Sequence, residues 1–494
     1  MFWFYTKTTP KHELEENFTM LKRILALVLA SIMILSVMAG CNTEKPVETQ
    51  GNNTPKETDP VETEPKEVTI TIGNWPSEAD EANYKIMQDR LAKLNELYPY
   101  ITVIPQTSSG DIKEYVTLAA AGQLPNLYQV AYTELNTIAK SGFALDLTDL
   151  LDESGYLANL NPVLYDPVSY QDRIYAIPTS TYGIGLACNR AVFEAAGLVN
   201  ADGSLQFPET FDELTQTAIK IKETTGQYGI AIASTGIGGW IFTNIAWNFG
   251  VDFMEQQADG SWKATFNSQE CIDALQWIYD LKWVHEVLPE DALMDHNGQR
   301  KLFASDQCAM YLMHAPERGL VWSYGMDCTK ICYGSIPAGD GGRYSLSGGN
   351  LLVMSPETTP EQFDAVMKWI EVSGQSYYVS ENYEESLRST YQSWKEQGVP
   401  ILQDAILPIW INEERTEILQ RVRAEYTNIP ASNFATYLAF DGVTLRAEEP
   451  EYCQELYSIL DGVLQEILAN KDVDIAALVA KAANDFQANY LNNA

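Results

Sequence analysis

The sequence offers few side chains in arrangements that catalyse reactions. It contains no Gly-x-Ser-x-Gly nucleophile motif, no His-Glu-x-x-His zinc motif and no phosphate loop ending in Gly-Lys-Ser/Thr. The histidines are His12, His285, His296 and His314. So few histidines make a histidine-based zinc site a poor hypothesis, and the Cys328-x-x-x-Cys332 spacing is a weak metal signal by itself. We therefore expect no enzyme, no metal and no cofactor.

Carboxylates and glycines give no catalytic pattern either. Adjacent pairs such as Glu384 with Glu385 are more often solvated faces than acid/base pairs, because catalysis would need burial to separate their pKa values. The glycine-rich stretch at residues 339–350 lacks the spacing of a phosphate loop. We interpret it as a flexible crossing between two parts of the chain.

Aromatic residues are the most informative side chains. The chain has 11 Trp, 27 Tyr and 16 Phe. Sugars present apolar C–H faces and hydroxyls, so a sugar site needs flat rings beside fixed polar groups. Trp277, Trp283 and Trp369 follow helical periodicity, which predicts core positions. Trp75 and Trp240 stand next to proline or glycine in predicted loops, which makes them candidate ligand platforms.

Length and charge narrow the class of protein. With 494 residues, 46% of them hydrophobic, the chain can bury a sizeable core and exceeds the length of one typical domain, which predicts two lobes. The formal net charge of −35 repels phosphate backbones and anionic headgroups, so we expect no nucleic-acid partner. Seven cysteines are too few to form a disulfide framework for so long a chain. The sequence is compatible with free thiols and with a few disulfide bonds.

The N-terminal region is typical of an exported protein. An apolar run at residues 24–39 follows two basic residues and is short for a membrane-spanning helix, which favours a secretory signal peptide. The acidic residues before Met20 do not suit a signal peptide. We therefore expect residues 1–19 to be an upstream mis-start and residues 20–40 to be the signal peptide.

The signal ends in Met-Ala-Gly-Cys, which resembles the lipobox of bacterial lipoproteins. In such proteins the cysteine, here Cys41, is acylated and becomes the new N-terminus. Residues 41–67 are rich in Pro, Thr, Glu and Asn and almost free of apolar residues, so they predict a disordered tether. The expected location is the extracellular face of the cell membrane, with the protein anchored there through the lipid on Cys41.

From Val68 onward short apolar strands alternate with helical patterns. The predicted strands are residues 68–72, 101–105 and 126–131, and the predicted helices are residues 82–97, 111–125 and 133–142. This alternation indicates a parallel sheet covered on both faces. Ligands of such sheets bind at the carboxyl ends of the strands, which would place Asn74, Trp75 and Tyr132 near one crevice.

Four segments resemble the extracellular solute-binding proteins of sugar-type ABC importers, the maltose-binding-protein-like family. The segments are AAAGQLPNLYQVAYTELNTIAKSGFALDLTDLL, YQDRIYAIPTSTYGIGLACNRAVFEAAGL, FPETFDELTQTAIKI and FASDQCAMYLMHAPE. The resemblance extends over most of residues 68–494. The chain departs from the family pattern at Asn126, Cys188 and Ser305-Asp306, which are fold positions and say nothing of the ligand.

The resemblance implies an α/β protein with the two-lobe, type II periplasmic-binding-protein-like fold and a ligand cleft between the lobes. We expect residues 68–179 and 340–379 in the first lobe and residues 180–339 and 380–494 in the second. The candidate binding residues are Asn74, Trp75, Tyr132, Glu134, Tyr182, Trp240, Glu317, Arg318 and Asn350.

The leading hypothesis is a lipid-anchored extracellular receptor, expected to be a monomer. It would bind a sugar, expected to be an oligosaccharide, and deliver it to the permease of an ABC transporter. Two alternatives stay open. One is a binding protein of the same fold for another solute, such as a peptide or a metal. The other is a surface glycoside hydrolase or lyase, which would need two buried carboxylates at a fixed separation.

Overall fold

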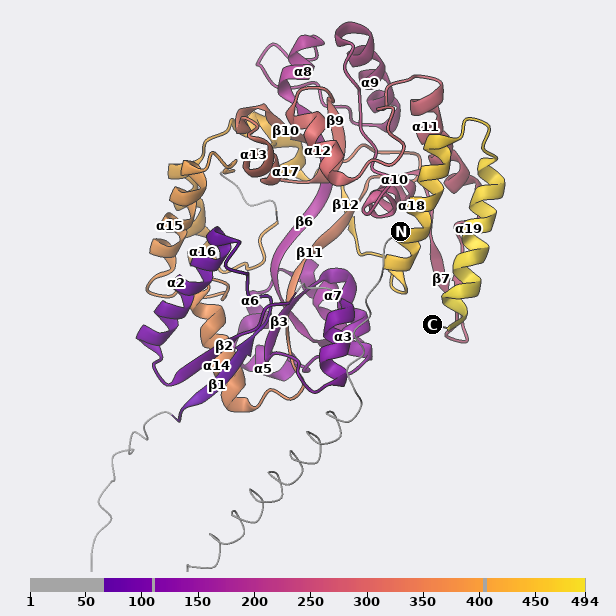
Figure 1. The fold of residues 1–494 in the computed structure, drawn as a ribbon. Coiled ribbons are helices and arrows are strands. Elements are labelled where there is room, and N and C mark those ends of the chain that lie inside the picture. Colours follow the sequence, from indigo (N-terminus) through magenta and orange to yellow (C-terminus); the bar gives the residue numbers. More distant parts are fainter. Residues whose placement is uncertain (1–65, 109–111, 403–406, 494) are drawn as a thin grey trace, which may run out of the picture. The chain divides into compact units, whose positions relative to one another are not determined.

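The computed structural model describes residues 66–108, 112–402 and 407–493. Two long strands, β6 (Ala176–Asn189) and β11 (Tyr344–Met354), run antiparallel through this part of the chain. One hydrophobic core lies along the start of β6 and the end of β11, and a second lies along the other halves. The two cores define a first and a second lobe joined by the two strands (Figure 1).

The first lobe is built on a short parallel sheet. Its central strand β1 (Val68–Ile72) pairs parallel with β2 (Ile101–Pro105) and β3 (Leu127–Ala131), and β11 joins β3 antiparallel. Helices α2 (Glu81–Leu97) and α14 (Pro360–Val372) pack on this sheet. The start of α14 is fixed by a capping box between Thr359 and Gln362.

The remaining elements of the first lobe are short. They are α3 (Ile112–Ala120), η1 (Tyr132–Glu134), α4 (Leu135–Lys140), α5 (Thr148–Glu153), α6 (Tyr156–Asn159), η2 (Pro162–Leu164), α7 (Tyr165–Val168), β4 (Ser169–Tyr170) and β5 (Arg173–Ile174). The strands and helices predicted for residues 68–142 are confirmed, with the helix at residues 133–142 divided between η1 and α4.

The second lobe forms around the end of β6. Strands β9 (Met310–His314) and β10 (Ile331–Gly334) flank β6 on its two edges, both antiparallel. The other elements are α8 (Arg190–Ala195), α9 (Phe211–Thr225), α10 (Gly238–Phe249), β7 (Met254–Gln256), β8 (Trp262–Ala264), α11 (Gln269–Trp283), α12 (His296–Ala304), α13 (Gly319–Tyr324), η3 (Cys328–Lys330), η4 (Ala431–Asn433), α17 (Ala435–Ala439), β12 (Thr444–Arg446), α18 (Cys453–Ala469), α19 (Ile475–Asn489) and η5 (Leu491–Asn493).

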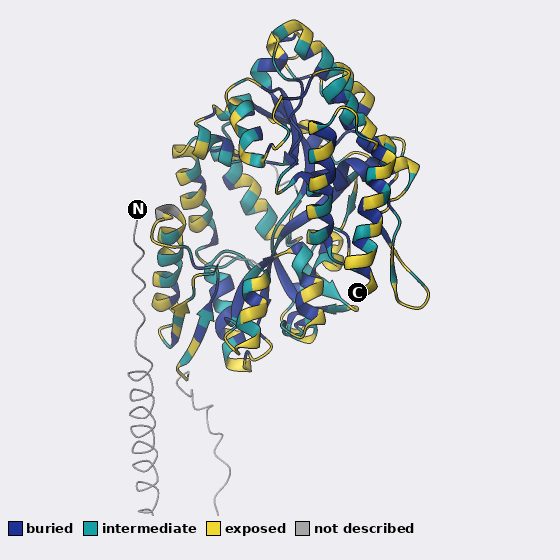
Figure 2. Cartoon of the chain, turned by 45° about the vertical axis from the view of Figure 1, so that its right-hand side comes forward, coloured by how far each residue is buried: buried dark blue, intermediate teal, exposed yellow. Residues whose placement is uncertain are grey.

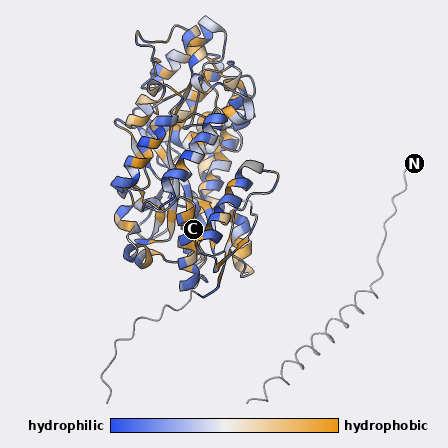
Figure 3. Ribbon diagram, turned by 90° about the vertical axis from the view of Figure 1, so that its left-hand side faces the viewer, coloured by the Kyte–Doolittle hydropathy of each residue, from blue (hydrophilic) through white to orange (hydrophobic). Residues whose placement is uncertain are grey.

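Buried residues gather on the strands and on the helix faces turned toward them (Figure 2). Hydrophobic and hydrophilic residues alternate along the outer helices, as expected for helices with one face on a core (Figure 3). The predicted pair of C-terminal amphipathic helices is confirmed as α18 and α19. Helix α10 lies against α18 at Gly239, where a Cβ atom would stand 2.7 Å from the Cα of Tyr457.

Glycines let β6 and β11 pass closely between the lobes. Gly348 pairs with Tyr182 and Gly349 with Thr181, and the register shifts after Asn350. A Cβ atom on Gly349 would lie 2.7 Å from the ring of Tyr132, so a side chain there has no room. This crossing lies in the glycine-rich stretch at residues 339–350, which was expected to be flexible. From Tyr344 onward the stretch is part of strand β11.

A helical hairpin, α15 (Tyr383–Glu396) with α16 (Glu413–Tyr426), has its own small core around Tyr391, Ile401 and Val422. The chain reaches it from the end of α14 and leaves it toward the second lobe.

Two stretches lie on the other side of the predicted lobe boundaries. Leu346 belongs to the second core although residues 340–379 were expected in the first lobe. Trp410 belongs to the first core, where its indole packs against Tyr156 with ring centroids 5.4 Å apart, although residues 380–494 were expected in the second lobe. The reason is that the chain crosses between the lobes within β11 and returns to the first lobe between α15 and α16. The other predicted boundaries stay predictions.

The predictions for residues 1–40, Cys41 and the tether up to residue 65 lie outside the described residues. None of the helices that the structure describes is long and apolar enough to cross a membrane. The described cysteines are all free thiols, namely Cys188, Cys271, Cys308, Cys328, Cys332 and Cys453.

Candidate functional site

A cleft of about 820 Å³ lies beside the two crossing strands. Its walls come from β6 and β11, from the segment that follows β9, from the end of α14 and from the α15–α16 hairpin. Since Trp410 belongs to the first core and Ala315 to the second, both lobes contribute to the lining. We refer to this space as the cleft.

Aromatic side chains supply much of the cleft lining. The rings are those of Tyr182 on β6, His314 on β9, Tyr391 and Trp394 on α15, and Trp410 before α16. Tyr182 is stacked on His314, with ring centroids 4.4 Å apart and an interplanar angle of 29°. Burial lowers the pKa of His314 to about 4, so this imidazole is neutral at neutral pH. Such flat surfaces match the C–H faces of sugar rings.

Fixed polar groups stand beside the rings. Ser180 Oγ accepts hydrogen bonds from Asn350 N at 3.1 Å and Asn350 Nδ2 at 3.2 Å, which locks the two crossing strands together at the cleft. Trp410 Nε1 donates to the carbonyl of Gln375 at 3.0 Å. The described residues that line the cleft include no Asp or Glu.

Three arginines, Arg318, Arg415 and Arg423, also line the cleft, and we call them the cleft arginines. The Cζ atom of Arg318 lies 4.0 Å from the ring centroid of Trp394, and that of Arg415 lies 4.3 Å from the ring centroid of Tyr383. Burial lowers the pKa of both guanidinium groups, yet arginine remains charged in proteins. The described lining of the cleft therefore carries a positive charge within a strongly acidic chain.

Three of the predicted binding residues, Tyr182, Arg318 and Asn350, line the cleft together. Their role toward a ligand stays a prediction. The other predicted residues, which are Asn74, Trp75, Tyr132, Glu134, Trp240 and Glu317, are not among those that line it.

Asn74 and Trp75 are held by contacts within the first lobe, and their predicted binding role stays a prediction. Asn74 has a positive φ of 53°, and its Oδ1 accepts hydrogen bonds from the Tyr115 hydroxyl and from Gln129 N, both at 2.7 Å. Trp75 is 2% exposed and packs against Trp369 with ring centroids 5.7 Å apart. Both side chains contact other residues of the first lobe and are not among those that line the cleft.

Tyr132 belongs to the core of the first lobe, and Trp240 packs against the core of the second lobe. Each forms a hydrogen bond within the protein. The Tyr132 hydroxyl donates to the Ser180 carbonyl at 3.1 Å, and burial raises its pKa to about 12. Trp240 Nε1 donates to Glu448 at 2.8 Å, and Tyr457 donates to the same carboxylate at 3.1 Å. Burial raises the pKa of Glu448 to about 7, and the charge of Glu134 adds to this rise.

Glu317 is held inside the second lobe by a group that we call the Glu317 cluster. Its buried carboxylate accepts hydrogen bonds from Arg300, with Nη2 at 2.5 Å, and from the Tyr311 hydroxyl. His296 Nε2 lies 2.9 Å from the same carboxylate. Burial alone would raise the pKa of Glu317, but His296 and Arg300 lower it to about 2. The carboxylate has its partners within the fold, and Glu317 is not among the described residues that line the cleft.

The sequence interpretation missed Trp394, Tyr391, Trp410, Arg415, Arg423 and His314 as lining residues. One signal was available for α16. Arg415, Leu419 and Arg423 are spaced by four residues, which puts them on one face of a helix. All three line the cleft. The tryptophans gave no comparable signal, because a ring on an amphipathic helix fits a core position equally well.

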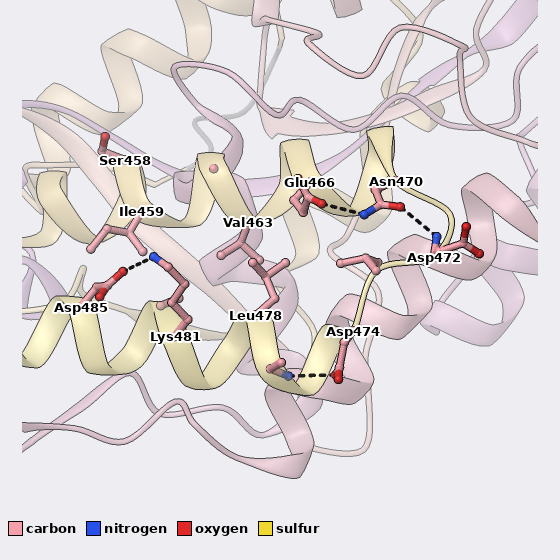
Figure 4. Close-up of a pocket in the computed structure, with 14 residues that line it drawn as sticks. Ser458, Ile459, Val463, Glu466, Asn470, Asp472, Asp474, Leu478, Lys481 and Asp485 are labelled. Atoms are coloured by element: carbon pink, nitrogen blue, oxygen red, sulfur yellow. Dashed lines mark hydrogen bonds and ion pairs between the residues drawn. The ribbon is translucent and has the colours of Figure 1, made fainter.

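A second hollow, of about 620 Å³, lies along the outer helices α18 and α19 (Figure 4). Ile459, Val463 and Leu478 contribute its apolar surface, and the ion pair of Lys481 with Asp485 stands at one end. All of its lining residues come from this helix pair and its connecting turn. It lies away from the crossing strands, so the cleft remains the candidate site.

The sequence model of bacterial extracellular solute-binding proteins matches residues 76–373 of the chain. The chain belongs to this family. The predicted two-lobe, type II fold of the family is thereby confirmed, as is the family resemblance itself. No curated protein sequence matches this member of the family.

Solved structures of other solute-binding proteins share the fold. One from Thermotoga lettingae, bound to α-D-tagatose, has 23% identity and a TM-score of 0.62 over 85% of this chain and 98% of its own. The maltose-bound MalE3 of T. maritima has 21% identity and a TM-score of 0.61 over 85% and 99%. UgpB of Mycobacterium tuberculosis, in complex with glycerophosphocholine, has 15% identity and a TM-score of 0.60 over 85% and 98%.

Proposed function

We propose that this solute-binding protein captures a sugar, expected to be an oligosaccharide, in the cleft and delivers it to the permease of an ABC transporter. The observation that carries the proposal is the lining of the cleft by Tyr182, Tyr391, Trp394 and Trp410 beside hydrogen-bonding groups of the crossing strands. Stacking rings with a few fixed polar groups are what sugar recognition needs. Several proteins of the same fold were solved with bound sugars.

The size of the cleft supports a ligand larger than one sugar unit. A volume of about 820 Å³ lies in the upper part of the usual range for small-molecule sites. Capture would use both lobes, since contacts made by both favour the closed arrangement. The permease would then recognise that arrangement, and the protein itself would carry out no reaction.

The remaining parts of the proposal concern location and partners. Acylation of Cys41 would hold the protein at the extracellular face of the membrane, with residues 42–67 as a spacer. The partners would be a carbohydrate and the permease subunits, and the receptor would act as a monomer. Mass spectrometry of the membrane-extracted protein should find a lipid on Cys41, and Cys41→Ala should release the protein into the medium.

A hydrolase function receives no support from the cleft. Glycoside hydrolysis uses two carboxyl groups on either side of the scissile bond. Among the described residues that line the cleft there is neither Asp nor Glu.

A thermal-shift screen of the protein against mono- and oligosaccharides tests the sugar proposal. A ligand present at a hundred times its Kd should stabilise the fold by about 2.7 kcal/mol. Trp394→Ala should weaken binding of the sugar found by about tenfold or more, because it removes one stacking surface. Trp322→Ala is the matched control, since Trp322 is 52% exposed and lies outside the cleft.

The proposal is wrong if no sugar shifts the unfolding temperature of the wild type. The assignment to the cleft is wrong if Trp394→Ala and Trp322→Ala affect affinity equally.

A further inference from the structure

The charge of the cleft is opposite to that of the chain. The whole sequence has 67 Asp and Glu against 32 Lys and Arg. The described cleft lining has Arg318, Arg415 and Arg423 and no carboxylate. An acidic chain has many carboxylates available to pair with these arginines, so their positions beside an open space need an explanation.

Arg318 is only partly satisfied by the protein. One face of its guanidinium lies over the ring of Trp394 at 4.0 Å, which fixes the orientation of the group. Its Nε atom is buried and has no hydrogen-bond partner among the described residues. A buried donor without a partner carries a desolvation cost, which no described residue relieves here.

Arg415 is held in a similar way. Its Nη2 donates to the carbonyl of Gly374 at 2.9 Å, and the guanidinium lies over Tyr383 at 4.3 Å. Its Nη1 atom is buried without a hydrogen-bond partner among the described residues. A second cleft arginine is therefore held in position by the protein and has a donor that no described residue pairs.

Arg423 completes the group. Its Nε donates to the hydroxyl of Tyr391 at 2.7 Å, and this tyrosine lies close enough to Arg318 and Arg415 to influence both guanidinium groups. Arg318 and Arg423 repel each other, because the positive charge of Arg423 acts on Arg318. The three guanidinium groups thus gather around one tyrosine in the wall of the cleft.

Several other arginines of the described chain do have carboxylate partners. On α16, Arg421 pairs with Glu384 at 2.7 Å, and nearby Arg388 pairs with Glu425 at 2.5 Å. In the second lobe, Arg300 pairs with Glu317. None of the cleft arginines forms an ion pair with a described residue. Within α16, Arg421 has a carboxylate partner and does not line the cleft, whereas Arg423 lines the cleft and forms no ion pair with a described residue.

We propose that the ligand of the cleft is an acidic carbohydrate, whose carboxylate, sulfate or phosphate group binds to Arg318, Arg415 and Arg423. This inference rests on the proposed function and names the class of sugar. Guanidinium groups match the planar, two-oxygen geometry of such anions, and the aromatic rings of the cleft would stack on the sugar rings. A neutral sugar could satisfy single donors but would leave the three positive charges without a counter-charge among the described residues of the lining.

Isothermal titration calorimetry with matched ligand pairs tests the inference. The pairs are a galacturonate trimer with its fully methyl-esterified form, a sulfated disaccharide with its parent, and a phosphorylated disaccharide with its parent. We expect one acidic member to bind at least tenfold more tightly than its neutral counterpart, with an affinity that falls as salt increases. The pair with the largest ratio identifies the anion.

The outcomes separate this inference from the function on which it rests. Equal or tighter binding of the neutral members would overturn the charge inference and leave the sugar receptor intact. Failure of every acidic and neutral sugar to bind would overturn both.

A pair of variants on α16 tests the residues. Arg423→Gln should weaken binding of the acidic sugar by roughly ten- to a hundredfold, the usual effect of losing one charged hydrogen bond. Arg421→Gln removes the same charge two residues away and should change the affinity by less than about twofold, since exposed charges are screened. Equal losses in both variants would overturn the assignment to the cleft.

Arg318→Lys covers the case in which Arg423→Gln does not fold. It keeps the positive charge but loses the planar arrangement of donors, so we expect a severalfold loss of affinity for the acidic sugar with the unfolding temperature unchanged. An acidic sugar that binds Arg318→Lys as tightly as the wild type would overturn the role of Arg318.

Discussion

Glu317 and Arg318 are neighbours in sequence and lie in two different regions of the molecule. Glu317 points into the second lobe, where Arg300 and Tyr311 donate to its carboxylate. Arg318 lines the cleft, where its charge meets an aromatic face and no described carboxylate. Both were predicted as binding residues from the same short segment, and the structure separates them by what each side chain contacts.

The difference lies in where the hydrogen-bond partners come from. A buried charge is tolerated only when it is paired, and the Glu317 cluster provides the pairing from within the fold. Two of the cleft arginines, Arg318 and Arg415, each have a buried donor without a hydrogen-bond partner among the described residues. Partners inside the fold indicate a structural role, whereas unused donors beside a cleft indicate a role toward a ligand.

The Glu317 cluster should give the largest change in stability. Glu317→Gln removes a fully buried negative charge and leaves Arg300 without its counter-charge. We expect a loss of about 3–5 kcal/mol in the free energy of unfolding, the usual cost of breaking a buried pair. Urea unfolding followed by circular dichroism measures it.

The exposed pair of Glu384 with Arg388 gives the control. Glu384→Gln should leave the urea midpoint close to that of the wild type. Equal effects of the two substitutions would mean that the Glu317 cluster is no more structural than a surface ion pair.

The same cluster should make the fold sensitive to acid. The pKa of Glu317 is lowered to about 2 from an ordinary value of 4.5. Its contribution is therefore complete above pH 4.5 and is lost as the pH falls toward 2. Glu317→Gln should remove this part of the acid dependence, and thermal unfolding between pH 2 and 6 would detect the change.

Glu448 is a buried carboxylate whose pKa is shifted in the opposite direction from that of Glu317. Its carboxylate accepts from Trp240 and Tyr457 but has no cation beside it among the described residues, and burial raises its pKa to about 7. The protonated form is therefore favoured in the folded state. Its contribution should be present below pH 4.5 and lost as the pH rises through 7, by at most about 3 kcal/mol.

Glu448→Gln tests this sign, because the amide keeps the shape and does not titrate. The variant should show a flatter dependence of unfolding free energy between pH 5 and 8 than the wild type. An unchanged slope would show that Glu448 titrates at its ordinary pKa and is more solvated than the structure indicates.

The fold predicted from the sequence is confirmed, whereas the predicted site residues stay predictions, of which three line the cleft. The two-lobe fold was predicted from motifs at the ends of strands and helices. At these positions the spacing of residues along the chain determines where an element begins and ends, and the helices of the first lobe were predicted from it. Site residues depend on which way a side chain points after the chain has folded. Asn74 and Trp75 follow a strand as expected, but their side chains turn into the core.

The hairpin was the least predictable contributor to the cleft. Residues 383–426 are far in sequence from β6 and β11, and only the folded chain brings them to the same space. Periodicity can place Arg415 and Arg423 on one face of α16 but cannot say what that face meets. The unused donors of the cleft arginines can be recognised only when the positions of all their neighbours are known.

Substitution of Gly349 tests how closely strands β6 and β11 must pack where they cross between the lobes. In Gly349→Ala the Cβ atom would lie 2.7 Å from the ring of Tyr132 and close to the Ser180 carbonyl. We expect a loss of about 1–3 kcal/mol in unfolding free energy from overpacking. Gly462→Ala on α18 is the control. A Cβ atom at Gly462 would have no atom of another part of the protein within 4 Å, and alanine favours a helix. A neutral effect at Gly349 would mean that the crossing strands can separate easily.

Arg318 should give the smallest change in stability, although it is next to the residue with the largest. Arg318→Met keeps an apolar stem against Trp394 and removes a buried donor that has no partner. The cation–π contact is worth about 1 kcal/mol, and relief of the unpaired donor offsets part of it, so the unfolding free energy should change by less than about 1 kcal/mol. Urea unfolding beside Glu317→Gln gives the comparison under one set of conditions. A loss as large as that of Glu317→Gln would mean that Arg318 has a structural role. The reason is that, without a bound ligand, removing a side chain costs stability only through its contacts within the fold.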